Sequence, residues 1–182
     1  MRHALALITP ILLLAPSALA QVGADHLITP GVGIGPLKVG TNIIEAKAAV
    51  GTPRATLEPR AEWLASVVGM IPDGSTAYFF YDYISTTKGR ARSGGGLRVI
   101  ASRDGILVWV QADYAPEFVT ENGIHTGLSE SQVRSIMGEP TRIVKLFGGH
   151  ALVYPGLTMT VVDNPDLTGY RTVVNIGVFL PR

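Results

Sequence analysis

Cysteine is absent from the 182-residue sequence. The protein therefore forms no disulfide bonds and offers no cysteine to which a lipoprotein lipid could be attached. Its fold has to rest on a hydrophobic core. A chain of this size is long enough for one, since such chains bury roughly 70% of the surface that they expose when unfolded. We expect a soluble protein and not a lipoprotein.

An excess of either charge is also lacking. The 15 basic and 14 acidic residues give a net charge of +1, which argues against general binding to nucleic acid. One segment departs from this balance, because residues 88–103 carry five basic groups and no acid. We interpret it as a solvated loop, with a site for an anionic partner as the alternative.

A long apolar run occurs only at the start of the chain. Arg2 and His3 are followed by twelve mainly apolar residues, 4–15, and then by the small residues Ala18 and Ala20. This pattern predicts a secretory signal peptide, because the run is shorter than the roughly 20 residues that a membrane-spanning helix needs. We expect cleavage after Ala20, a periplasmic or secreted protein, and no membrane span in what remains.

Motifs for catalysis and metal binding are missing as well. Ser85 and Lys88 match an S-x-x-K pattern, but they follow a predicted strand and lack the S-D-N and K-T-G partners of such enzymes. His26, His125 and His150 are too far apart for a spaced metal motif, although a site built from distant strands stays open. We expect no cofactor, no metal site and no catalytic residue, and we favour a non-enzymatic role.

Two stretches, "GTNIIEAKAAVGTP" and "GLSESQVRSIMGEP", share the same helix signals. Each opens with a capping-box pair, in which a cap side chain and a residue three positions later bind each other's backbone amides: Asn42 with Glu45, and Ser129 with Gln132. Each closes with Gly-x-Pro, whose glycine permits the left-handed conformation that ends a helix. The sequence therefore predicts two short helices, which need packing partners because isolated helices of this length are marginal.

Segments rich in β-branched and aromatic residues follow each predicted helix, with hairpin breaks such as Asp104-Gly105 between them. We predict an α+β fold of two tandem repeats, each with short helices packed on one face of an antiparallel sheet. The repeats lie side by side or form one continuous sheet, and the first contains a further short helix over residues 62–68. The predicted segments are a signal peptide (1–20), an extended lead-in (21–35), the first repeat (36–119) and the second repeat (120–182).

The pattern Gly-x-Ser/Thr/Asn-x-x-Glu/Gln followed by Gly-x-Pro, at residues 40–53 and 127–140, resembles the SmpA/OmlA and β-lactamase-inhibitory-protein group. Two such units in tandem are similar to the inhibitory-protein arrangement in particular. The resemblance implies an exported protein that acts by binding another protein. The chain departs from the group in lacking both the lipoprotein cysteine and the disulfide cysteines of some inhibitors. The matching residues are caps and helix stops, so no functional residue follows from them.

The candidate binding residues come from the aromatic strand 78–83 and the strands after it. Alternation along a strand puts Tyr81 and Tyr83 on one face, and Trp109 shares a face with Gln111 on a later strand. Aromatic and arginine side chains are enriched at protein-binding hot spots. We predict that an open sheet face binds a partner through Tyr81, Tyr83, Arg98, Trp109 and Gln111, with burial of the aromatic residues in the core as the alternative.

The sequence thus favours an exported, non-catalytic protein-binding module that acts as a monomer on another exported or envelope protein, without nucleic acid. The alternative function is a periplasmic hydrolase or small-ligand receptor with a cleft between the repeats. An open aromatic face would favour the binding module, and a deep pocket with converging histidine and carboxylate groups would favour the hydrolase. A structural envelope protein with a featureless sheet face is a third possibility.

Overall fold

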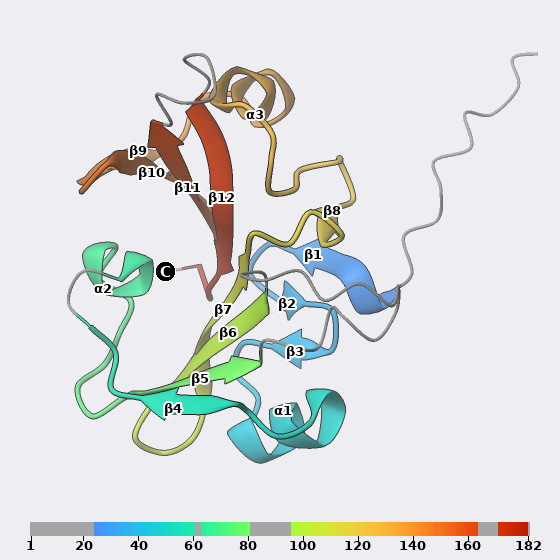
Figure 1. Cartoon of the computed structure of the whole chain (residues 1–182), viewed down its shortest axis with the longest axis vertical. Coiled ribbons are helices and arrows are strands. Elements are labelled where there is room, and N and C mark those ends of the chain that lie inside the picture. Colours follow the sequence, from blue (N-terminus) through green and yellow to red (C-terminus); the bar gives the residue numbers. More distant parts are fainter. Residues whose placement is uncertain (1–23, 61–62, 81–95, 164–170, 182) are drawn as a thin grey trace, which may run out of the picture.

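The main element of the fold is an eight-stranded antiparallel sheet (Figure 1). A computed structural model describes residues 24–60, 63–80, 96–163 and 171–181. The strand order is β4-β5-β6-β7-β12-β11-β10-β9, so β4 and β9 are the two edges. The bounds are β4 (Ala55–Leu57), β5 (Thr76–Phe80), β6 (Gly96–Ala101), β7 (Leu107–Asp113), β9 (Arg142–Leu146), β10 (Gly149–Tyr154), β11 (Leu157–Asp163) and β12 (Arg171–Val178).

The sheet consists of two halves that meet at its centre, where β7 pairs with β12 and Gln111 lies opposite Gly177. In each half the four strands pair in chain order. β7 carries an extra residue, Val108, opposite β6, and β12 carries an extra residue, Val174, opposite β11. The expected α+β fold is therefore confirmed, and the two sheet halves form one continuous sheet with a bulge at the matching place in each.

Two short helices precede the two sets of strands, as the sequence predicts: α1 (Ile43–Val50) and α3 (Glu130–Met137). The capping box is complete at α3, where the Ser129 hydroxyl accepts from the Gln132 amide and the Gln132 side chain accepts from the Ser129 amide. At α1, Asn42 accepts from the Ile44 amide, and the return bond expected from Glu45 is not part of this cap. In the described part of the chain, no helix is long and apolar enough to cross a membrane.

Both helices are also tied to the sheet by the glycine that lies two residues before the cap. The amides of Gly40 and Gly127 each donate, over 2.7 Å, to the carbonyl of the residue just before the bulge of β7 or β12. Both glycines have φ near +90°, which a residue with a side chain rarely adopts. The glycine pattern in the sequence thus sets the place at which each helix meets its sheet half.

Replacing Ser129 by alanine should lower the free energy of unfolding by about 1 kcal/mol, because the Gln132 amide loses its acceptor. Denaturant titration measures the loss. Ser135→Ala is the matched control, since Ser135 is an exposed residue of the same helix and alanine there favours the helix slightly. Equal stability of the two variants would show that the capping box contributes nothing.

A second, smaller sheet covers the outer side of the centre of the large one. Its order is β3-β2-β1-β8, with β1 (Leu27–Thr29), β2 (Gly33–Ile34), β3 (Leu37–Lys38) and β8 (Val119–Thr120), and β1 pairs with β8 in parallel. It follows a short 3-10 helix, η1 (Ala24–His26). Ile28, Ile34 and Leu37 are buried with residues of α1, α3 and the large sheet in the main core. Part of the predicted lead-in is therefore a component of the core.

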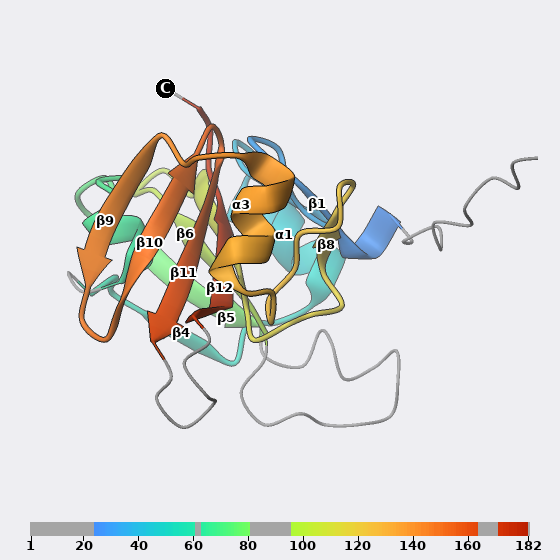
Figure 2. The same ribbon diagram turned by 90° about the horizontal axis from the view of Figure 1, so that it is seen from above.

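The prediction that the helices cover one face of the sheet is wrong for α2 (Leu64–Val67), which is the further short helix expected near residues 62–68. α1 and α3 lie against the outer face, whereas α2 lies in the hollow of the curved sheet (Figures 1 and 2). There Leu64 and Val68 join a second core with residues of β5, β6, β7 and β10. The Arg142 guanidinium of β9 donates to the Val68 carbonyl over 3.1 Å. The α2 segment thus connects the two sheet halves.

Candidate functional site

The predicted binding residues that the structure describes do lie on one face of the sheet. Arg98 pairs in register with Gln111 on the neighbouring strand, and Trp109 and Gln111 are hydrogen-bonded to each other. Trp109 is 0% exposed and Gln111 is 2% exposed, so the expectation of an open face is wrong for both. The face is covered because α2 packs in the hollow and Phe179 stacks on Trp109 with 5.7 Å between ring centroids. Tyr81 and Tyr83 lie outside the described residues.

Polar groups on this covered face bind one another in a row along β7. The Trp109 indole N–H donates to Gln111 Oε1 over 3.0 Å, and the Gln111 amide donates to Asp113 Oδ1 over 2.5 Å. Arg98 Nη2 lies 3.3 Å from Asp113 Oδ2. Burial raises the pKa of the Asp113 carboxyl, against the lowering effects of the Arg98 charge and the Gln111 hydrogen bond. The row satisfies buried polar atoms, as a sheet interior requires.

Arg98 completes this cluster from the neighbouring strand. Its guanidinium lies 4.8 Å from the ring centroids of both Trp63 and Phe79, a position in which a cation is attracted by the aromatic faces. With Asp113 on its other side, Arg98 is held by packing and charge together. We interpret Arg98, Trp109 and Gln111 as structural residues that hold the covered face together. For Trp109 this agrees with the alternative that the sequence left open, burial of the aromatic residues in the core.

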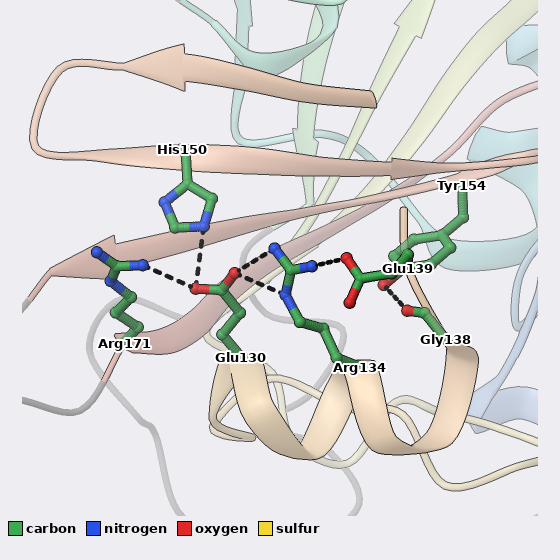
Figure 3. A network of polar contacts seen from close by, with 7 residues as sticks. All are labelled: Glu130, Arg134, Gly138, Glu139, His150, Tyr154 and Arg171. Atoms are coloured by element: carbon green, nitrogen blue, oxygen red, sulfur yellow. Dashed lines mark hydrogen bonds and ion pairs between the residues drawn. The ribbon is translucent and has the colours of Figure 1, made fainter. Parts of the chain in front are cut away.

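A second polar cluster surrounds Glu130 at the start of α3 (Figure 3). Arg134 Nε and Nη2 lie 2.9 and 2.7 Å from Glu130 Oε1, and Arg134 also pairs with Glu139. His150 Nε2 of β10 and Arg171 Nη1 of β12 lie 3.2 and 3.4 Å from Glu130 Oε2. Both carboxylate oxygens are therefore engaged by cations or donors from two strands and the helix itself.

The electrostatics of the cluster favour an ionised Glu130. Burial by itself would raise the pKa of Glu130, but hydrogen bonding by Arg134 and the charges of His150 and Arg134 outweigh burial and lower the pKa below its ordinary value. An ionised carboxylate whose oxygens are both engaged is poorly placed to abstract a proton. We interpret the cluster as the ionic attachment of α3 to the sheet.

Glu130→Gln should reduce stability by about 1–3 kcal/mol at pH 7, because hydrogen bonds to a charged group are lost. The folded pKa of Glu130 lies below its unfolded value, so its contribution is complete above the unfolded pKa of about 4.3 and is lost as pH falls through the folded pKa. Unfolding titrations from pH 7 to pH 2 should therefore show the variant and the wild type converging. Glu121→Gln, at an exposed carboxylate, is the control, and a constant gap across this range would contradict the assignment.

Sequence reasoning missed most of the Glu130 cluster. The spacing of Glu130 and Arg134 could have indicated their pairing, because residues four apart share a helix face. No role was predicted for His150, yet its side chain is only 14% exposed and faces Glu130. No local pattern places it there, because the contact depends on how β10 packs under α3. Among the described residues, no group of three or more His, Cys, Asp and Glu side chains could hold a metal ion.

The edge strand β9 and the turn that follows it expose two large apolar side chains. Val144 and Leu146 pack against the second core, whereas Ile143 on the other side of the strand is 52% exposed. Phe147, in the turn that follows, is fully exposed. Figure 2 shows β9 at the outer edge, and β10 is its partner among the described strands. An unpaired edge with exposed apolar side chains is a template for another strand.

The comparisons with known proteins supply no function. No protein-family profile matches the chain, and no curated protein matches it. One similar solved structure is a cysteine-rich secretory protein from Staphylococcus aureus, 15% identical with a TM-score of 0.48, and 86% of this chain aligns with 49% of that one. This chain thus spans about half the length of that protein. Another is a DUF4309 family protein from Bacillus subtilis, 9% identical with a TM-score of 0.49, covering 86% and 89% of the two chains.

Proposed function

We propose that the chain is an exported, non-catalytic protein-binding module, built as a tandem repeat, and that a strand of its partner joins the sheet at β9. The start of the sequence and its resemblance to the β-lactamase-inhibitory-protein group support export and protein binding. The matching strand order, bulges and glycine hydrogen bonds of the two halves support the repeat.

The exposed edge of β9 is the observation that carries the proposal. Strand addition gives affinity through backbone hydrogen bonds, and the side chains of the edge give specificity. Phe147 and Ile143 provide apolar contact area that the folded chain leaves in water. A single lysine on an edge often discourages unwanted pairing. In β9, Lys145 lies beside these exposed apolar groups. We therefore infer that Lys145 discourages pairing with basic or uncharged strands and leaves the edge open to an acidic one.

The chemistry of the partner follows from the charges on β9. Arg142 and Lys145 are exposed, although the Arg142 guanidinium also donates to the Val68 carbonyl, and the strand contains no acidic residue. A partner strand with acidic side chains would complement them, whereas a second copy pairing through its own β9 would add two more basic residues and no acidic residue. The proposed partner is therefore an extended apolar and acidic segment of another exported protein. Tyr81 and Tyr83 stay predicted contributors to partner binding.

Phe147→Ser should weaken binding of the partner at least tenfold while leaving the fold intact, because Phe147 is fully exposed in the free protein and exposed aromatic residues are common hot spots. Affinity capture from the envelope fraction of producing cells, followed by quantitative mass spectrometry, measures the change. Ile44→Ser, on α1, is the control, since Ile44 is 73% exposed and α1 lies beside the half of the sheet that does not contain β9 (Figure 1). Equal recovery of partners by both variants would rule out β9 as the binding edge.

A further inference from the structure

A groove opens at the place where the first half of the chain passes into the second. Its volume is about 360 Å³, which lies in the range of small-ligand sites. The walls come from the chain after β7, the chain before α3, and β11 and β12. The lining residues are Tyr114, Pro116, Thr126, Gly127, Val162 and 172–174.

The lining determines what the groove can accept. None of the lining residues that the structure describes is ionisable near neutral pH, and most of them are valine, threonine, proline or tyrosine. A ligand charge placed there would lose its hydration without gaining a counter-charge, which is costly. An uncharged hydrocarbon chain would incur no such desolvation cost, and burial of its apolar surface would favour binding.

Among the lining residues other than glycine, Tyr114 has an unusual backbone conformation. Its φ is +46°, and it is the one residue other than glycine with a positive φ among the described residues. Its amide donates to the Val174 carbonyl over 2.8 Å, which fixes this conformation beside the groove. Glycine would adopt it without the steric cost that a tyrosine incurs. The side chain is 59% exposed, so packing within the protein does not account for tyrosine at this position.

We propose that the groove is a binding site for an uncharged hydrocarbon chain, such as the acyl or alkyl part of a neutral lipid, and that Tyr114 covers the bound chain from the rim. Its ring supplies apolar contact area, and its hydroxyl stays in water at the mouth. This site does not depend on the β9 edge or on a protein partner. The proposed ligand also differs from the substrate of a hydrolase, since no histidine or carboxylate is among the described residues that line the groove.

The test uses the full chain, the neutral fluorophore N-phenyl-1-naphthylamine as a probe, and straight-chain primary alcohols of increasing length as competitors. Each added methylene should strengthen competition about fourfold until the groove is filled, as expected for burial of a methylene group. Tyr114→Gly should weaken alcohol binding at least tenfold with an unchanged or higher melting temperature, because it removes the ring and relieves the backbone. Tyr114→Phe should bind as the wild type does.

The proposal would be overturned by no dependence on chain length, by equal binding by Tyr114→Gly and the wild type, or by equally strong competition by alkylammonium ions of the same length. Preferential binding of an uncharged proline-rich peptide in the same competition assay would overturn it in favour of a peptide site. Phe147→Ser separates this test from that of the proposed function, since it should leave alcohol binding unchanged while it weakens capture of the protein partner.

Discussion

Trp109→Ala should lower the free energy of unfolding by about 3–5 kcal/mol, the usual cost of truncating a buried tryptophan. Trp109 is fully buried in the second core, stacks on Phe179 and donates its indole N–H to Gln111. The loss is large beside the 5–15 kcal/mol by which most domains are stable. Denaturant titration followed by circular dichroism measures it.

Ile44→Ala provides the baseline for this measurement, since it shortens a 73% exposed apolar residue and should change stability by less than about 0.5 kcal/mol. A loss below about 1 kcal/mol for Trp109→Ala would mean that the hollow is open in solution. That result would favour the prediction from the sequence that Trp109 lies on an open binding face.

Gly177→Ala is the second substitution with a large expected effect. A Cβ at Gly177 would lie 2.2 Å from Cζ2 of Trp109 across the central strand pair, so either the indole or the strand has to move. Overpacking of this kind costs about 1–3 kcal/mol. The free energy of unfolding of the single variant measures the cost directly.

The double variant Gly177→Ala/Trp109→Ala shows whether the clash is with the indole. Once the indole is gone, alanine at position 177 has room, so the double variant should be about as stable as Trp109→Ala alone. Contacting residues are expected to deviate from additivity in this way. Additive losses would show that the cost of alanine at position 177 has a cause other than Trp109.

The helix signals were the part of the fold that could be predicted best. Asn42, Ser129 and the glycines after each helix act through neighbours within a few residues, so local sequence contains the information. The faces of the central strands were also predictable, because side chains alternate along a strand whatever covers the sheet. For this reason Arg98, Trp109 and Gln111 were correctly placed together.

What covers each face could not be predicted, because it depends on contacts between residues far apart in the chain. The α2 segment reaches β9 through Val68 and Arg142, and no periodicity in either segment indicates that contact. The same holds for His150 and Arg171 at Glu130, which come together when β10, β12 and α3 pack. The exposure of Phe147 is likewise a property of the hairpin turn in the folded sheet.

Comparison of the two halves shows where they differ. The matching bulges place Asn175 of β12 at the position that Trp109 occupies in β7. Trp109 fills the space above Gly177 on the neighbouring strand. Asn175 has no ring with which to fill the corresponding space beside β12. The hollow is therefore filled mainly from the first half, by Trp109 and α2. Because the hollow is covered, the exposed apolar side chains of the sheet lie at its edges and turns, among them Ile143 and Phe147.

Site-specific photocrosslinking in producing cells tests the central claim most directly. A photoreactive phenylalanine analogue at position 147 should crosslink to a second polypeptide, and mass spectrometry should place the linkage in an extended segment with acidic side chains. The same analogue at position 44 on α1 should give no such product. Crosslinks from position 44 alone, or none from position 147 when the protein is folded and exported, would contradict binding at the β9 edge.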